Sequence, residues 1–237
     1  MALTSVTIKF MDLKFIQVNI YKGRYFDALV DFLRQEKPDF ISMQEVTTGK
    51  LNYTDDKTIN LFRELADKLG MEGVYNGDLK LEGNEGSTFG NAVLTKFPIV
   101  NSYIEVLSEF RPLTLEEIEE DQEISGKVPR HVLDLTVDIN GQLVHAMSWH
   151  GAWTAPPTDT GETLKQAKMV AEYLKSLDEP FILGCDTNAV IQSKTIETIN
   201  EVATNLMEGS GILQTTHPKI HKIVPRGYLI DFIFVSP

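Results

Sequence analysis

The feature that most constrains the fold is an apolar run that ends in polar residues, Phe181–Val190. The run starts after Pro180, which ends a preceding helix, and its large apolar residues follow one another without interruption. Such a run is typical of a strand buried on both faces. Asp186 and Asn188 follow at its end, where open α/β sheets present ligand-binding groups. The segment predicts a strand that delivers an acid and an amide to a site, although a strand followed by an ordinary turn fits equally well.

Length and composition indicate a globular chain with a sizeable core. The 237 residues are 42% apolar and 24% charged, so disulfides are not needed for stability. The single cysteine, Cys185, excludes an internal disulfide and a CxxC zinc site, and is more typical of a buried thiol than of a nucleophile. No linker divides the chain, so we expect one domain over residues 1–237, with residues 1–10 a leader of uncertain status.

The net charge of -12 opposes non-specific nucleic-acid binding, which depends on Lys and Arg contacts to phosphate. It leaves room for a local basic groove or an acidic site filled by a metal. The sequence shows no secretory signal and no apolar run long enough to span a bilayer. We therefore expect a cytoplasmic protein without integral membrane contact.

Apolar spacing predicts an alternation of strands and helices. Strands are expected over residues 13–20, 40–46, 91–100, 131–139, 143–149, 181–186 and 228–235, and helices around 26–33, 59–69, 164–174 and 196–206. Asn140-Gly141 is a strong hairpin signal, and the glycine-rich stretch 76–90 predicts a loop. The first half predicts a βαβ unit. The acidic stretch 115–122 matches no EF-hand and indicates a solvated segment rather than a calcium site.

Four more polar residues stand at or within apolar strands. Asn19 and His150 lie at strand ends, where each could be an ordinary structural residue. Glu45 shares its alternation with Ile41 and Met43, so its carboxylate needs a salt bridge or a cation. Asp231 lies in the middle of an apolar strand and also needs a partner.

Together these groups indicate a shared site. Hard oxygen ligands without cysteine favour Mg²⁺ or Mn²⁺ over zinc. A divalent cation, an imidazole and an amide suit phosphoryl transfer, which requires charge neutralisation, orientation of the phosphate and activation of water.

The order and wording of these motifs resemble the endonuclease/exonuclease/phosphatase superfamily, which includes deoxyribonuclease I, abasic-site endonucleases, sphingomyelinases and inositol polyphosphate 5-phosphatases. The matching segments are Gln17-Val18-Asn19, Met43-Gln44-Glu45-Val46, Gly90-Asn91-Ala92-Val93-Leu94, Phe97-Pro98-Ile99, Ser148-Trp149-His150, Gly184-Cys185-Asp186-Thr187-Asn188 and Ile230-Asp231-Phe232-Ile233-Phe234-Val235-Ser236. The resemblance implies a four-layer α/β/β/α sandwich, with two mainly antiparallel sheets face to face and helices outside. This replaces the βαβ interpretation.

The resemblance also implies roles for the metal and the water. Glu45 should bind the metal, with Asn19 steadying that carboxylate or the metal's water. Asp186 should orient or deprotonate the attacking water. Asn188 should hold the phosphate or the nucleophile.

The resemblance gives His150 a donor role toward a phosphoryl oxygen and pairs Asp231 with a second, catalytic histidine. Here the sequence departs from the family, which usually ends with a Ser-Asp-His motif on a further strand. This chain stops at Ser236-Pro237, so that C-terminal strand is apparently missing. The chain is truncated, or His217 or His221 takes the role, or the protein is catalytically impaired.

The leading hypothesis is a Mg²⁺- or Mn²⁺-dependent hydrolase that cleaves a phosphodiester or phosphomonoester by water attack. Its substrate could be a nucleic acid end, a lipid headgroup or a small molecule. The alternative is a truncated or impaired member that acts as a phosphate-binding or interaction module. An unrelated α/β domain with structural carboxylates is the third reading.

Overall fold

The computed structural model describes residues 12–114, 117, 128–217 and 227–237. The proposed leader, nearly all of the acidic stretch 115–122 and His221 therefore lie outside the described residues. The elements are β1 (Phe15–Asn19), η1 (Tyr21–Gly23), α1 (Phe26–Glu36), β2 (Phe40–Thr47), η2 (Gly49–Leu51), α2 (Leu61–Leu69), β3 (Glu72–Leu81), β4 (Asn84–Thr95), β5 (Ile99–Val106), β6 (His131–Ile139), β7 (Gln142–His150), α4 (Gly161–Lys175), β8 (Phe181–Asp186), α5 (Lys194–Asn200), β9 (Thr204–Asn205) and β10 (Asp231–Val235).

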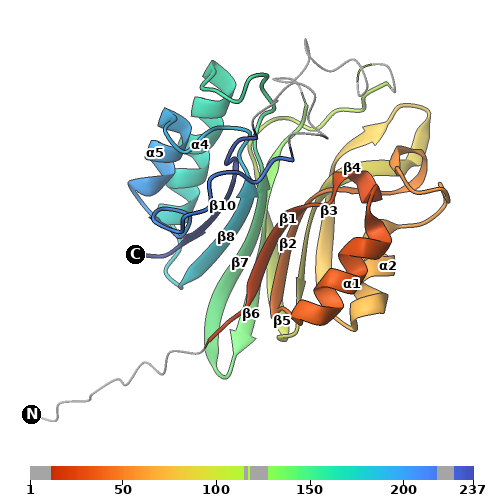
Figure 1. Cartoon of the computed structure of the whole chain (residues 1–237), viewed down its shortest axis with the longest axis horizontal. Helices are drawn as coiled ribbons and strands as arrows, with labels where there is room; N and C mark the ends of the chain where they lie inside the picture. The colour runs from red at the N-terminus through yellow and green to blue at the C-terminus, as the bar shows by residue number, and fades with distance from the viewer. Residues whose placement is uncertain (1–11, 115–116, 118–127, 218–226) are drawn as a thin grey trace, which may run out of the picture.

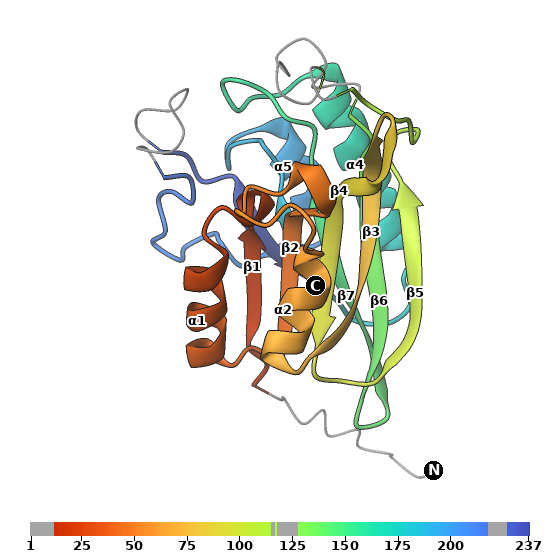
Figure 2. The same cartoon turned by 90° about the vertical axis from the view of Figure 1, so that its right-hand side faces the viewer.

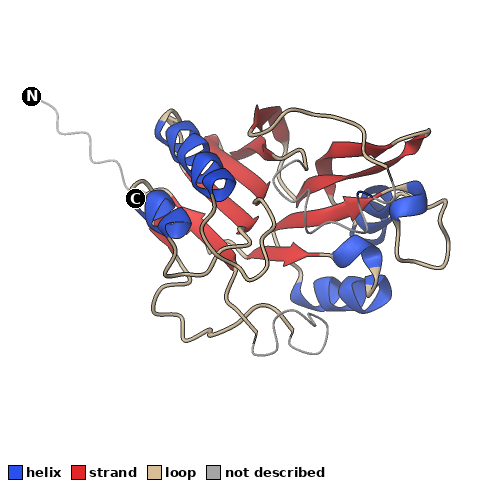
Figure 3. Cartoon of the chain, turned by 90° about the horizontal axis from the view of Figure 1, so that it is seen from above, coloured by secondary structure: helices blue, strands red, loops and turns tan. Residues whose placement is uncertain are grey.

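Two sheets lie face to face between two layers of helices (Figures 1 and 3). One has the strand order β1-β2-β4-β3 and the other β5-β6-β7-β8-β10-β9. Only β1/β2 and β7/β8 pair in parallel among the described strands, so both sheets are mainly antiparallel. Helices α1 and α2 cover the first sheet (Figure 2), and α4 and α5 cover the second. The predicted sandwich is confirmed, and β1, α1 and β2 form a parallel βαβ unit within it.

Apolar side chains fill three layers, because each sheet is covered on both faces. Examples are Val30, Leu65 and Met43 beneath α1 and α2, Phe40, Val93 and Leu135 between the sheets, and Ala167, Val170 and Phe232 beneath α4 and α5. Cys185 is fully buried in the last layer, as expected for a structural thiol. None of the described helices has the length and apolarity to cross a membrane.

The predicted loop over residues 76–90 is wrong. Strands β3 and β4 pair through this stretch, with a turn at Gly83, whose φ is 68°. Gly90 serves strand pairing instead, because a Cβ there would collide with the backbone oxygen of Asn76 on the neighbouring strand. The predicted helix over 196–206 also ends early, at Asn200, and β9 follows because it pairs with β10.

Asp231 is the first residue of β10, not a residue in the middle of a strand. The segment before it pairs with a loop: the Tyr228 carbonyl accepts hydrogen bonds from the Thr215 and Thr216 amides, at 2.8 and 3.0 Å. Asp231 is consequently half-buried at the end of the strand, where its carboxylate is near the ends of β1 and β8.

Candidate active site

The site begins with an amide that links carboxylates from both sheets. Asn19 ends β1, and its Nδ2 lies 3.0 Å from Glu45 Oε1 on β2 and 3.0 Å from Asp186 Oδ2 at the end of β8. Its Oδ1 accepts a hydrogen bond of 2.9 Å from the Tyr21 amide, which fixes the orientation of the group. The structure thus brings Asn19, Glu45 and Asp186 together.

Glu45 stands on a β-bulge, which the sequence did not predict. Its φ is 54°, and the pairing of β2 with β4 shifts register between Met43 and Val46. Met43 and Val46 pack in the same apolar cluster although they are three residues apart. The predicted alternation of Glu45 with Ile41 and Met43 is therefore wrong, because the extra residue in the bulge redirects the side chains.

A tight turn after β8 holds Asp186 and Asn188. The Asn188 amide donates to Asp186 Oδ1 at 3.1 Å, and Asn188 Nδ2 donates to the Gly151 carbonyl at 3.2 Å. Asn188 has a φ of 51°, which asparagine tolerates better than most residues. Gly151 has no room for a side chain, since a Cβ there would lie 2.6 Å from the Thr187 oxygen. Asp186 and Asn188 therefore have a fixed geometry, with each side chain 5% exposed.

The carboxylates of the site repel one another. Burial, followed by Asp231 and, more weakly, Glu45, raises the pKa of Asp186 well above its usual range, against hydrogen bonds from Asn19 and Asn188. A cation would relieve this repulsion. Mg²⁺ takes one or two carboxylates and completes its shell with water and phosphate, so Glu45 and Asp186 fit its needs. Within the described part of the chain no three His, Cys, Asp or Glu side chains are placed so that together they could hold a metal ion, so water and phosphate would have to complete the shell.

His150 ends β7 as predicted, in register with Asp186 on β8. It is 3% exposed, and within the described ranges its Nδ1 has no hydrogen-bond partner. Burial lowers the pKa of His150 well below its usual range, and the nearby charges of Arg130, Lys22 and His131 lower it further. The imidazole is therefore neutral near pH 7.

Asp231 faces the same group of side chains. It is in register with Asp186, and Gln17 Nε2 donates to its Oδ1 at 3.3 Å. The pairing of Asp231 with a histidine, His217 or His221, stays a prediction, and His221 lies outside the described residues.

A buried polar network beneath the site escaped the sequence analysis. The side-chain amides of Gln17 and Gln44 bond to each other, and Gln44 Nε2 reaches Ser148 Oγ on the other sheet at 2.8 Å. Ser148 Oγ in turn donates to the Met43 carbonyl at 3.0 Å. The network joins the sheets directly below the bulge at Glu45. Its signal in the sequence was a glutamine or serine in an otherwise apolar strand.

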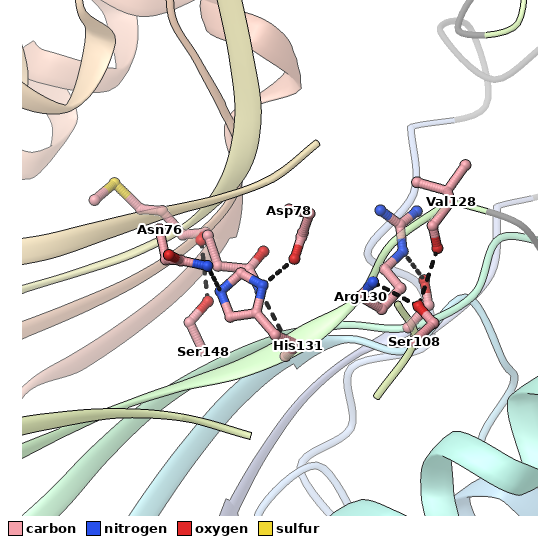
Figure 4. A network of polar contacts seen from close by, with 10 residues as sticks. Asn76, Asp78, Ser108, Val128, Arg130, His131 and Ser148 are labelled. Atoms are coloured by element: carbon pink, nitrogen blue, oxygen red, sulfur yellow. Dashed lines mark hydrogen bonds and ion pairs between the residues drawn. The ribbon is translucent and has the colours of Figure 1, made fainter. Parts of the chain in front are cut away.

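Arg130 and His131 were also missed. Arg130 Nε donates to the Gly151 carbonyl at 3.1 Å, the same oxygen that Asn188 contacts, so this guanidinium borders the site. Figure 4 shows His131 between Asn76 and Asp78, with its Nδ1 bonded to Asp78 Oδ1. No local pattern marks either residue, because their partners are far away in the sequence.

Two surface cavities, of about 440 and 320 Å³, lie beside the site. The larger is bounded by Arg24, Phe26 and the Tyr53–Asp55 segment, and it adjoins the turn that follows Asn19. None of the predicted site residues lines either cavity.

The structure resembles solved proteins of one family. A mannosyl-6-phosphatase from Bacteroides thetaiotaomicron VPI-5482 has a TM-score of 0.69 and 17% identity, covering 95% of this chain and 86% of that one. TDP2 from D. rerio, complexed with a single-strand DNA product, has a TM-score of 0.64 and 18% identity, covering 94% and 83%. An endonuclease/exonuclease/phosphatase family protein from Leptotrichia buccalis C-1013-b has a TM-score of 0.68 and 18% identity, covering 95% and 88%.

A search of curated proteins found no match. The family model described as Endonuclease/Exonuclease/phosphatase family matches residues 16–237, which includes every predicted site residue. Members of this family are hydrolases that act on phosphoester bonds. The resemblance inferred from the motifs is confirmed: this chain belongs to the endonuclease/exonuclease/phosphatase family.

Proposed function

We propose that this chain is a divalent-metal-dependent phosphoesterase that hydrolyses a phosphate ester by attack of water. The observation that carries the proposal is the Asn19 amide, which joins the Glu45 and Asp186 carboxylates at 3.0 Å each. Such an arrangement gives a hard cation its oxygen ligands. The neutral, buried His150 ends the strand beside Asp186, and its Nδ1 has no hydrogen-bond partner among the described residues, which leaves the imidazole without a structural role there.

The side chains divide the reaction between them. A bound Mg²⁺ or Mn²⁺ supplies neutralisation of the phosphate charge. Asp186 orients the attacking water and accepts its proton on a carboxylate oxygen. Asn188 Nδ2 and the imidazole of His150 hold the phosphoryl oxygens. The water oxygen bonds to phosphorus as the bond to the ester oxygen breaks, and the leaving oxygen takes up a proton from a solvent water.

Arg130 adds a cation to this machinery. Its guanidinium is 4% exposed and adjoins Asn188 through the shared Gly151 carbonyl. A desolvated cation stabilises the charge that develops on a transferring phosphoryl group more strongly than an exposed one does. Relatives in structure that act on phosphate esters include a mannosyl-6-phosphatase and TDP2 with its DNA product, so small-molecule and nucleic-acid-end substrates both belong in a first panel.

The first test compares Glu45→Gln with wild type. Hydrolysis of p-nitrophenyl phosphate and bis-p-nitrophenyl phosphate is followed with Mg²⁺, with Mn²⁺ and with EDTA. We expect turnover only with metal. In Glu45→Gln the turnover should fall about 10²-fold or more, because the variant lacks a carboxylate ligand of the metal that stabilises the developing charge. Titration calorimetry with Mn²⁺ should show weaker binding in the same variant.

Glu172→Gln is the matched control, because Glu172 is an exposed acid on α4, the helix that covers the other sheet. Its activity should equal that of wild type. A folded wild-type chain that binds Mn²⁺ and phosphate but turns over neither substrate would contradict the proposal and favour a phosphate-binding module.

A further inference from the structure

Lys22 stands on an unusual turn directly after Asn19. Tyr21, Lys22 and Gly23 have φ values of 48°, 54° and 79°, so two consecutive non-glycine residues adopt a left-handed backbone. Side chains disfavour this conformation, and it persists where surrounding structure imposes it, often at functional sites. Of the other non-glycine residues with positive φ, Glu45 and Asn188 belong to the site. The left-handed backbone at Lys22 is therefore grouped with those at Glu45 and Asn188, which both belong to the site.

The turn holds the ammonium group of Lys22 over two aromatic rings. Lys22 Nζ lies 3.3 Å from the Tyr53 hydroxyl, 4.9 Å from the centre of the Tyr53 ring and 5.9 Å from the centre of the Phe89 ring. The residue is half-buried, and no carboxylate in the described ranges lies within ion-pair distance. Lysines that do pair with acids are Lys14, Lys68, Lys96 and Lys165.

Arg130 approaches the same place from the other sheet. Its guanidinium carbon lies 5.8 Å from the centre of the Phe89 ring, and that ring lies 6.0 Å from the imidazole of His150. Both cations are close enough to His150 to lower its pKa. Two positive side chains thus converge on a neutral histidine, in a chain whose net charge is -12.

We propose that Lys22 and Arg130 together bind the phosphoryl group of the substrate as a dianion, so that this site selects phosphomonoesters over phosphodiesters. The inference rests on the proposed function and names its substrate class. A monoester phosphate carries nearly two negative charges at neutral pH, whereas a diester carries one. The acids Glu45, Asp186 and Asp231 would repel the second charge unless side-chain cations offset it. Lys22 provides the cation that a diester would not need.

Binding of two small anions tests this without turnover. Inorganic phosphate and dimethyl phosphate are titrated calorimetrically into wild type, Lys22→Met and Lys22→Arg, in the presence of Mg²⁺ at pH 7.5. We expect Lys22→Met to bind inorganic phosphate about 10- to 100-fold more weakly, the scale of one lost charge-assisted contact. Its affinity for dimethyl phosphate should change less than about threefold, and Lys22→Arg should restore most of the phosphate affinity.

Lys165→Met is the matched control, because it removes one positive charge from α4, on the outer face of the other sheet. It should bind both anions as wild type does, which separates a local contact from a change in net charge. Melting temperatures of all variants report whether they are folded. Lys22→Gln, which keeps a polar side chain, replaces Lys22→Met if that variant is unfolded.

Kinetics extend the test to the reaction. The ratio of kcat/KM for p-nitrophenyl phosphate to that for methyl p-nitrophenyl phosphate should fall about 10-fold in Lys22→Met. Equal losses for both esters, unchanged phosphate affinity, or wild-type protein that binds both anions equally would overturn the inference. A chain that binds phosphate through Lys22 but lacks turnover refutes only the proposed function, whereas an active chain indifferent to Lys22 refutes only the inference.

Discussion

Strand β7 carries two histidines in opposite environments. His145 Nδ1 lies 2.7 Å from Asp134 Oδ2 and its Nε2 lies 3.5 Å from Glu179 Oε2. The hydrogen bond to Asp134 is the main cause of its raised pKa, with burial opposing and Glu179 assisting. His150, five residues later, has a pKa well below its usual range because of burial and neighbouring cations.

The difference shows that positive charge is gathered at one end of this strand. His145 lies among acidic side chains, and the carboxylates of Asp134 and Glu179 pair with its imidazole. At His150 the acids Asp186 and Asp231 lie at the neighbouring strand ends, and the cations Lys22 and Arg130 are close enough to lower its pKa. The net charge of -12 therefore does not reveal that cations face this histidine. Function should be sensitive to the His150 end, and stability to the His145 end.

Exchanging an acid at each end gives the largest expected contrast. Asp186→Asn should lower kcat by about 10³-fold, since it removes the carboxylate that orients and deprotonates the attacking water. The same variant should not be less stable than wild type, because it relieves the repulsion that raises the pKa of Asp186. Asp134→Asn should leave activity intact and lower the free energy of unfolding by about 1–3 kcal/mol, because Asp134 accepts from His145 and, at 2.6 Å, from Tyr173.

Urea unfolding and hydrolysis of p-nitrophenyl phosphate measure both quantities on the same preparations. Similar stability losses in Asp186→Asn and Asp134→Asn would remove the contrast between the two ends. Full activity in Asp186→Asn would contradict its assignment to the reaction.

The histidines themselves provide the second contrast. His150→Gln should lower kcat by about 10²- to 10³-fold, the usual effect of losing one donor to developing charge. His145→Gln keeps the size and polarity of its residue and lies outside the site, so its kcat should match that of wild type. Steady-state kinetics with saturating Mg²⁺ distinguish the two. Comparable kcat values for both variants would mean that His150 does not touch the phosphoryl group.

The sequence predicted those features that depend on local pattern. The run after Pro180 forms β8 and releases Asp186 at its end. Asn140-Gly141 turns the β6/β7 hairpin, with positive φ at both residues, and this hairpin delivers His150. Each signal lies within a few residues of its consequence, which is why a single sequence was sufficient.

The missed features depend on pairing between distant segments. The bulge at Glu45 exists because β2 is paired with β4, and a strand alone does not reveal its register. The glycines of residues 76–90 suggested a loop, but they permit close approach of β3 and β4. Arg130 contacts the site through residues far from it in the sequence, such as Gly151, whose carbonyl lies 21 residues away. The sequence motifs predicted the acids and amides of the site, whereas the cations Lys22 and Arg130 were recognised only in the structure.

The pH dependence of stability gives the smallest effect and the finest comparison of the two ends. The pKa of His145 is raised in the folded state, so its contribution is fully present below its unfolded pKa of about 6.5 and is lost as the pH rises through the folded pKa. His150 has the opposite sign. Its pKa is lowered in the folded state, so protonation of the unfolded chain lowers stability as the pH falls below about 6.5.

Urea unfolding of wild type, His145→Gln and His150→Gln at pH 5.5 and pH 8.5 measures this difference. Relative to wild type, His145→Gln should be less stable at pH 5.5 than at pH 8.5, and His150→Gln should be more stable at pH 5.5 than at pH 8.5. The two changes should therefore have opposite signs. The same sign in both variants would mean that the two ends of β7 do not differ in charge environment. It would also contradict the effect of Lys22 and Arg130 on the pKa of His150.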